Sequence, residues 1–321
     1  MLRRCIAATA FACAAVCCGS VVAQAYPAKP VRLVVPFPAG GPNDILGRLL
    51  AGRLSEMWAQ QVIVDNRPGA GANIGTEIVA KAAPDGYTLL LTGSAIAIAP
   101  SIYPNLAYDP LKDFAPVTNV ASSAAILVVH PSVPAKSVRE LVLLAKAQPG
   151  KINYASPGTG TPLHLAAALF GTMAGINIVH IPYKGAAPAL VDVIGGQVSM
   201  MIAPLFPTFS DVKAQKIRAL GVTSVKRSPI APDVPTIAEI IPGYEANFWY
   251  GMFGPAKIPG AIITKLNNDI VNALAFGEVR ERIALLGIEA VGSTVEQFTA
   301  ELKSDVPKWA KVVKASGARV E

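Results

Sequence analysis

Short apolar runs alternate with segments of helical spacing along most of the chain. Residues 31–36 form a run rich in branched aliphatic side chains that stops at a Pro/Gly cluster, and residues 43–56 then place leucine and isoleucine on one helical face. The same order recurs at residues 62–82, and a further strand is expected at residues 87–91. This alternation predicts an α/β fold with a mostly parallel, doubly wound sheet.

A second series of the same kind starts near residue 125. The expected strands lie at residues 125–129, 152–154, 178–181, 199–203 and 219–222, and the expected helices at 137–147, 163–171 and 187–194. Ser137 and Glu140 have the spacing of a capping box at the first of these helices. Because the pattern starts a new sheet, we expect residues 121–247 to form a second lobe. Residues 26–120 and 248–321 should form the first, since the late helix at 262–274 needs a sheet to pack against.

The first 25 residues have the pattern of an export signal. Arg3 and Arg4 precede an apolar stretch at residues 6–16, and Ala23-Gln24-Ala25 offers a small-x-small cleavage site. We therefore expect a periplasmic protein whose mature chain, residues 26–321, begins at Tyr26.

All four cysteines lie in this leader, at Cys5, Cys13, Cys17 and Cys18. Their position excludes disulfides and cysteine catalysis from the mature chain. The residues before Cys17 and Cys18 are a poor version of the triplet that precedes a lipidated cysteine, so we expect no lipid anchor. Beyond the leader, no run approaches the roughly 18 consecutive apolar residues that a membrane span requires.

Composition indicates a large core and limits the partners. The chain is 52% hydrophobic and 15% charged, against about 25% charged in a typical soluble domain, which excludes disorder. The formal net charge is +7, but lysine and arginine are spread along the chain, so we expect no nucleic-acid partner. A mild positive excess fits either a weak field that favours small anions or ordinary solubility.

Four loops rich in small residues follow strands and precede helices. They lie at residues 36–44, 68–75, 157–164 and 183–188. Ligands of open α/β sheets bind outside the carboxyl ends of the strands, and free N–H groups of a first helical turn attract anions. The loops therefore predict a site for a small carboxylate or another anion.

Motifs for other chemistries are weak or absent. The loop Gly69–Gly75 has the spacing G-x-G-x-x-x-G, one residue longer than a dinucleotide fingerprint, and no acidic residue ends the next strand. The chain has no Gly-Lys-Ser/Thr phosphate loop, no G-x-S-x-G serine elbow and no zinc spacing of its three histidines. We expect no cofactor, no metal and no enzymatic activity.

Several polar residues have two open interpretations. Asp44 either contacts a ligand or caps the N-terminus of its helix, and the cap is favoured. Lys184 either offers its charge to an anion or is solvated beside a glycine turn. His164 lies one turn into a helix within reach of a ligand, or is structural, whereas His130 and His180 end strands and are expected to be structural.

Five motifs in order resemble one family of receptors. They are Val35–Asp44, Asp65–Gly75, Ala83–Leu89, Ser156–Thr161 and Ile181–Gly185. Together they are similar to the Bug, or TctC-type, extracytoplasmic solute receptors of tripartite tricarboxylate transporters, over essentially the whole mature chain. The departures are small: Ala72 stands where a third glycine is common, and Pro162 follows a turn where members of the family vary.

The resemblance implies a type II periplasmic binding protein, with two doubly wound α/β lobes that close on a small carboxylic acid in the cleft between them. It also implies a pair of membrane permease subunits as partners, and we expect a monomer. The ligand is expected to be held largely by backbone and hydroxyl groups. The residues expected at the site are Phe37, Pro38, Ala39, Gly40, Gly41, Asp44, Ser94, Thr159, Gly160, Thr161, His164, Lys184 and Gly185. A binder of a neutral metabolite, such as an amide or a vitamin-like ring, and a secreted α/β hydrolase remain as alternatives.

Overall fold

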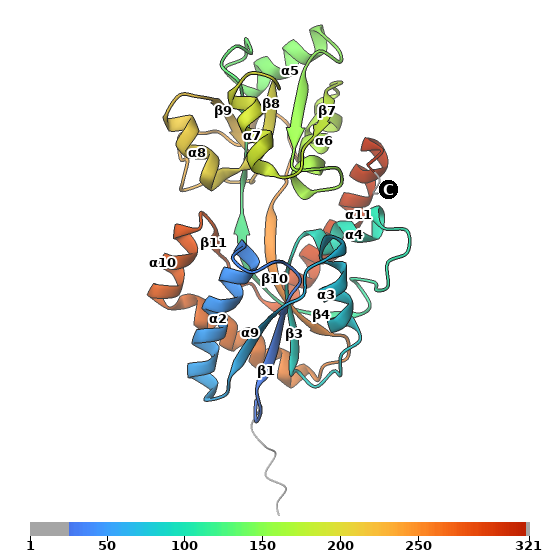
Figure 1. Ribbon diagram of the computed structural model, residues 1–321, viewed down its shortest axis with the longest axis vertical. Coiled ribbons are helices and arrows are strands. Elements are labelled where there is room, and N and C mark those ends of the chain that lie inside the picture. The colour runs from blue at the N-terminus through green and yellow to red at the C-terminus, as the bar shows by residue number, and fades with distance from the viewer. Residues whose placement is uncertain (1–25, 319–321) are drawn as a thin grey trace, which may run out of the picture.

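The computed structural model describes residues 26–318, which form two α/β lobes, one above the other in Figure 1. The expected export signal at residues 1–25, with its cleavage site and four cysteines, lies outside the described residues. Among the described helices, none combines the length and the apolar composition that a membrane crossing needs.

The first lobe is built on a six-stranded sheet with the order β11-β4-β10-β3-β1-β2. Its strands are β1 (Val31–Val35), β2 (Val62–Asn66), β3 (Thr88–Gly93), β4 (Phe114–Ser123), β10 (Phe248–Pro255) and β11 (Glu289–Ala290). Its helices are α2 (Pro42–Trp58), the 3-10 turn η1 (Ala70–Ala72), α3 (Asn73–Ala80), α4 (Ala95–Ile102), α9 (Gly260–Ala275) and α10 (Gly277–Leu285). The elements expected from the hydrophobic pattern up to residue 91 are all present, whereas α4, β4, β10, α10 and β11 were not predicted.

The second lobe is built on a five-stranded sheet with the order β7-β6-β8-β5-β9. Its strands are β5 (Ala125–Val129), β6 (Asn153–Ser156), β7 (Val179–Pro182), β8 (Met200–Pro204) and β9 (Arg218–Val222). Its helices are α5 (Val138–Ala147), α6 (Pro162–Ala174), α7 (Ala186–Ile194), α8 (Leu205–Lys213) and the 3-10 turn η2 (Ile237–Glu239). The expected strands and helices of this series are therefore present as well.

The expected capping box at α5 is only half formed. The Ser137 hydroxyl accepts a hydrogen bond from the backbone N–H of Glu140, as predicted. The Glu140 carboxylate accepts from the backbone N–H of Lys136 at 2.7 Å, one residue before the cap. Both groups still satisfy backbone donors at the start of the helix.

Strand direction differs from the mostly parallel sheet that the pattern predicts. β1 is parallel to β2 and β3, and β6 is parallel to β7 and β8. In contrast, β10 is antiparallel to β3 and β4, β11 is antiparallel to β4, and β5 is antiparallel to β8 and β9. Figure 1 shows the reason, because β4 leads directly into β5 and β10 returns from the upper lobe. A strand that arrives from the other lobe has no crossover helix in its own sheet, and it is this helix that makes neighbouring strands parallel.

The long C-terminal helix α11 (Val295–Ser316) contacts both lobes. It packs against α4 and β4 of the first lobe and against α6 of the second. The helix α9, in contrast, packs against α2 and β4 of the first lobe. The lobe boundaries at residues 120 and 248 stay a prediction. They assign α11 to the first lobe, and α11 also contacts the second.

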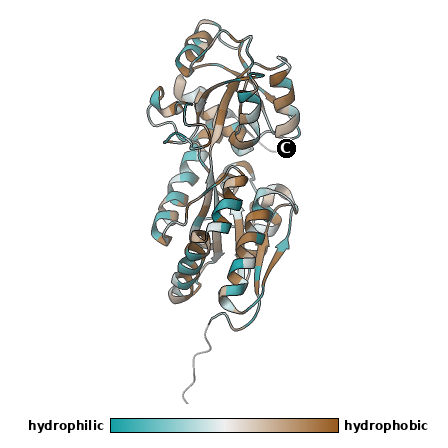
Figure 2. Ribbon diagram, turned by 90° about the vertical axis from the view of Figure 1, so that its left-hand side faces the viewer, coloured by the Kyte–Doolittle hydropathy of each residue, from teal (hydrophilic) through white to brown (hydrophobic). Residues whose placement is uncertain are grey.

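The hydrophobic strands lie inside each lobe, and the helices turn their more polar faces outward (Figure 2). One aromatic cluster joins β10 to α11. Trp249 and Phe298 meet edge to face with ring centroids 5.2 Å apart, and Phe253 lies 5.0 Å from Phe298. The Trp249 indole N–H donates to the buried Asp305 carboxylate at 2.7 Å. This cluster anchors a crossing strand to the helix that contacts both lobes.

Candidate functional site

A cavity of about 400 Å³ lies between the lobes at the carboxyl ends of β1, β2, β3 and β6. The first lobe contributes the loops after β1 and β2 and one face of α4, and the second lobe contributes the loop after β6. The lining residues are Pro36, Phe37, Pro38, Pro68, Gly69, Gly71, Ala72, Ala95, Ile98, Ala99, Ile102, Tyr103, Thr159, Gly160, Thr161 and Pro162. The cavity has the position that open α/β sheets favour for ligands.

The structure brings together five of the residues expected at the site. Phe37 and Pro38 line the cavity from the first lobe, and Thr159, Gly160 and Thr161 line it from the second. The other expected residues do not line it in this structure, and they are Ala39, Gly40, Gly41, Asp44, Ser94, His164, Lys184 and Gly185.

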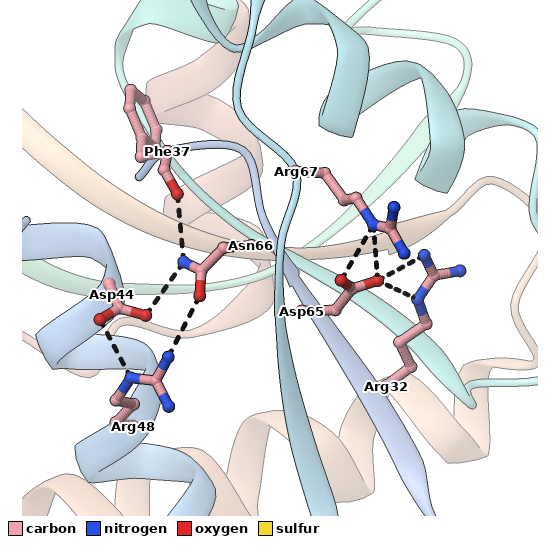
Figure 3. A network of polar contacts seen from close by, with 7 residues as sticks. All are labelled: Arg32, Phe37, Asp44, Arg48, Asp65, Asn66 and Arg67. Atoms are coloured by element: carbon pink, nitrogen blue, oxygen red, sulfur yellow. Dashed lines mark hydrogen bonds and ion pairs between the residues drawn. The ribbon is translucent and has the colours of Figure 1, made fainter. Parts of the chain in front are cut away.

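The Asp44 carboxylate fixes the loop between β1 and α2 through hydrogen bonds (Figure 3). Its Oδ2 accepts from the Gly40 N–H at 2.8 Å and from Arg48 Nε at 3.0 Å, and its Oδ1 accepts from Asn66 Nδ2 at 3.0 Å. Asn66 Nδ2 also donates to the Phe37 carbonyl at 3.1 Å. Burial alone would raise the pKa of Asp44, but these hydrogen bonds and the Arg48 charge lower it below its ordinary value. The geometry therefore gives Asp44 a structural role in positioning the loop.

The motif arginine Arg67 is also engaged in a structural contact. Its Nε donates to the Asp65 carboxylate at 2.9 Å, and Arg32 binds the same carboxylate from the neighbouring strand (Figure 3). Burial would raise the pKa of Asp65, but the two guanidinium groups lower it. Arg67 does not line the cavity, so its charge is directed to the edge of the sheet.

The loop after β6 is held by a hydroxyl and an imidazole. Thr161 is the N-cap of α6, and its hydroxyl donates to the Gly158 carbonyl and accepts from the His164 N–H. The Gly160 N–H donates to His164 Nδ1 at 3.1 Å. His164 is thus within two residues of the cavity wall but serves as an acceptor for the loop that forms it.

His164 belongs to a stack of rings inside the second lobe. Its ring lies parallel to that of His180 with centroids 3.9 Å apart, and Tyr154 stacks on His180 at 5.0 Å. His180 Nε2 shares a hydrogen bond of 2.6 Å with the Ser156 hydroxyl. Burial, followed by repulsion from a charged His180, lowers the pKa of His164 to about 4. Both histidines are therefore neutral acceptors or donors near neutral pH.

We expect acid to destabilise the protein partly through His164. Its pKa is about 6.5 in an unfolded chain and about 4 in the fold, so the unfolded state binds more protons between these values. The contribution of His164 is complete above pH 6.5 and decreases as the pH falls towards 4. Urea unfolding of His164→Asn, whose amide oxygen can still accept from Gly160, should show a flatter pH dependence than the unchanged protein. Equal slopes for the two proteins over this range would contradict the assignment.

Backbone donors expected at two other positions are already used. The Gly185 N–H donates to the Pro157 carbonyl at 3.0 Å, and the Ser94 N–H donates to the Trp249 carbonyl at 3.1 Å. Ser94 is buried, and Lys184 is exposed beside the cavity without lining it. These contacts join β6 to β7 and β3 to β10, and the sequence gives no signal for either.

The face of α4 is the part of the wall that sequence reasoning missed. Ala95, Ile98, Ala99 and Ile102 recur at helical spacing and line the cavity, followed by Tyr103. The segment is apolar on every side and contains Pro100, so the pattern gave no amphipathic face. The position of the segment was a signal, because it begins directly after the strand that ends at Gly93.

A larger cavity of about 670 Å³ lies between α10 and β11 of the first lobe and residues 224–230 of the second. None of the expected site residues lines it. The smaller cavity is the better candidate because two motif loops from the first lobe and one from the second meet there. Across residues 26–318, no group of three His, Cys, Asp or Glu side chains is arranged to hold a metal ion.

Residues 46–318 match the sequence profile of the family described as "Tripartite tricarboxylate transporter family receptor". The match includes the α4 wall and both lobes, so the whole of the cavity except the loop after β1 lies inside it.

Individual relatives are similar over nearly their full length. The protein BugT of Bordetella pertussis is 38% identical over 94% of this chain and 93% of its own. A structure of an R. palustris protein with adipate is 36% identical, with a TM-score of 0.75 over 92% of this chain and 100% of that one. MatC from Rhodopseudomonas palustris with bound malate is 29% identical, with a TM-score of 0.72 over 90% of this chain and 100% of that one.

Proposed function

The chain belongs to the receptor family of tripartite tricarboxylate transporters, a family of extracytoplasmic solute-binding proteins and not of enzymes, and on this basis we propose that its interlobe cavity captures a small carboxylate for uptake. The protein would act as a monomer that delivers the ligand to a pair of membrane permease subunits. Its export signal would be removed before Tyr26.

The observation that carries this proposal is that small-residue loops and the first turns of α4 and α6 line the cavity from both lobes. The N-cap residues Gly41 of α2 and Ser94 of α4 make no capping hydrogen bond through a side chain. In α4 the Ala97 N–H donates to the Ser94 carbonyl at 3.0 Å, which leaves the N–H groups of Ala95 and Ile96 for an anion, and α2 begins with Pro42, which has no N–H. The helix dipole favours negative charge at both N-termini. The adipate and malate bound by two structural relatives are both carboxylates, which agrees with this chemistry.

No charged side chain belongs to the residues that line the cavity. Of the two basic residues in the motif loops, Arg67 is paired with Asp65 and Lys184 is exposed outside the lining. A hydrogen bond to a charged group contributes roughly 1.5 to 3 kcal/mol, so several backbone donors can hold a carboxylate without an ion pair.

Lys184→Ala should weaken carboxylate binding by about tenfold or less, which corresponds to about 1.4 kcal/mol. The reason is that Lys184 can act only through a screened field across solvent. Isothermal titration calorimetry of both proteins with the same carboxylate measures the ratio. Complete loss of binding by a folded Lys184→Ala protein would make Lys184 an essential counter-ion and overturn this part of the proposal.

Gly41→Val should weaken binding strongly while it leaves the fold intact. Gly41 has an extended backbone, and a Cβ there would meet nothing nearer than the Pro38 carbonyl at 3.6 Å. Gly41 itself does not line the cavity, but the added side chain would lie next to Pro38, which does, and would crowd the loop on the cavity side. Gly52→Val on the same helix is the matched control, because a Cβ there meets nothing within 4 Å and Gly52 is far from the cavity lining. Unchanged affinity for Gly41→Val in calorimetry would count decisively against this site.

A thermal-shift screen of the mature protein tests the proposal as a whole. Carboxylates, neutral amides, amino acids and aromatic acids would be compared, since a ligand that binds only the folded state stabilises it by RT ln(1 + [L]/Kd) and so raises the melting temperature. Stabilisation by carboxylates is the expected result. Stabilisation by neutral amides or ring compounds alone would favour the alternative of a receptor for a neutral metabolite.

A further inference from the structure

The wall that α4 contributes to the cavity offers almost no hydrogen-bonding side chain. Ala95, Ile98, Ala99 and Ile102 face the cavity in succession along the helix. Their backbone N–H groups beyond the first turn belong to the helix, so they are not available to a ligand. Any part of a ligand that lies along this wall meets methyl and methylene groups.

The opposite walls are also poor in donors. Pro36, Pro38, Pro68 and Pro162 all line the cavity, and proline has no backbone N–H. The Gly160 N–H is already bonded to His164. The Thr161 hydroxyl is bonded to Gly158 and to the His164 N–H. The donors that remain are therefore away from α4's apolar face: at the helix N-termini, at Thr159 and Tyr103, and at the backbone N–H groups of Phe37, Gly69 and Gly71.

The Tyr103 hydroxyl is the polar group at the end of the apolar wall. A Cβ at Gly71 would overlap this hydroxyl, and Gly71 has a φ of +64°, which favours glycine. Because glycine has no side chain, Gly71 leaves room for the Tyr103 hydroxyl beside the cavity. Ile98, Ala99 and Ile102, which lie between this hydroxyl and the N-terminus of α4, offer a ligand no polar side chain.

We propose that this receptor selects carboxylates with an apolar body, either an alkyl chain or an aromatic ring, over polyhydroxylated acids of the same length and charge. The selecting surface is the α4 face of Ile98, Ala99 and Ile102. The inference rests on the proposed carboxylate function and adds to it the class of ligand.

The physical reason is the cost of a hydroxyl without a partner. Each hydroxyl that enters the cavity leaves its water and finds only carbon on the α4 side, which is unfavourable. An apolar pocket discriminates against an added hydroxyl by about a hundredfold at most. We therefore expect about tenfold to a hundredfold weaker binding for the hydroxylated member of a matched pair.

Calorimetry with matched pairs of acids tests this selectivity on the unchanged mature protein. Succinate and tartrate, adipate and galactarate, and benzoate and gallate share a carbon skeleton and a number of carboxylates, and differ in their hydroxyl groups. The expected result is tighter binding of the first member in each pair that binds.

Two variants of Ile98 test whether the α4 face is responsible. Thr and Val have nearly the same shape, so Ile98→Thr adds a hydroxyl to the wall and Ile98→Val is its control. Ile98→Thr should reduce the preference for the apolar acid, and Ile98→Val should retain it. The readout is a ratio of dissociation constants within each protein, so a small loss of stability shared by both variants does not affect it.

The outcomes separate this inference from the proposed function. If tartrate, galactarate or gallate binds as tightly as its partner or more tightly, the selectivity is wrong and the carboxylate function stands. If Ile98→Thr and Ile98→Val keep the same ratio as the unchanged protein, α4 is not the selecting surface. If no acid of any pair binds while neutral amides do, the proposed function itself fails.

Discussion

Ala95→Phe should weaken ligand binding strongly, because the new ring fills the cavity from the start of α4. Ala95 is half-buried and faces the cavity, so a large side chain there extends into the space between the lobes. The ring also covers the first-turn N–H groups of α4, which are the donors proposed for the carboxylate. We expect affinity to fall at least a hundredfold, or about 2.7 kcal/mol.

Calorimetry with the best acid of the thermal-shift screen measures this loss. Ala107→Phe is the matched control, because Ala107 is exposed on the segment after α4 and does not line the cavity. The control should bind as the unchanged protein does. Equal affinity of Ala95→Phe and Ala107→Phe would show that the ligand binds elsewhere, and the larger cavity beside α10 would then be the next candidate.

Trp249→Ala has the largest expected effect on stability. The Trp249 side chain is 1% exposed, packs against Phe253 and Phe298, and lies on the strand that returns from the second lobe. Removal of a buried aromatic side chain costs about 3 to 5 kcal/mol, out of about 5 to 15 kcal/mol for a whole domain. The Asp305 carboxylate, 5% exposed, loses the indole N–H as a partner at the same time and keeps Lys308.

Comparison with Trp249→Phe separates packing from hydrogen bonding. Trp249→Phe keeps a ring in the cluster and removes the indole N–H, so it should cost only about 1 to 3 kcal/mol. Urea unfolding of the three proteins gives the two differences. A Trp249→Ala protein no less stable than Trp249→Phe would show that the aromatic cluster contributes little to the fold.

The sequence alone predicted the alternation of strands and helices in both series, although it did not predict α4, β4 or α8. Apolar runs with branched side chains marked β1, β2 and β3, and leucine spacing marked α2, because these elements bury one side against the core and their periodicity is local. The motif loops also lay where predicted, since a loop that follows a strand ends at the carboxyl edge of its sheet. The resemblance to the family rested on five motifs in order, and the profile match over residues 46–318 confirms it.

Only the tertiary structure decided which groups line the cavity between the lobes. Ser94 and Gly185 were expected at the site, but their N–H groups are already bonded. The Ser94 N–H donates to the carbonyl of Trp249, which is distant in the sequence, and the Gly185 N–H donates to the carbonyl of Pro157 in another loop. Asp44 proved to hold its own loop together with Asn66. Hydrogen-bond partners that are distant along the chain leave no periodic signal, so no reading of one segment can assign them.

The wall of the cavity depends on packing in the same way. The run Ala95–Ile102 is apolar on all sides, and only its position against α3 and α11 leaves one face open to the space between the lobes. Likewise, α11 contacts both lobes because the chain returns through β10 to the first sheet. The sequence predicted which segments bury apolar surface. Contacts between segments that are distant in the sequence decided which part of that surface lines the cavity between the lobes.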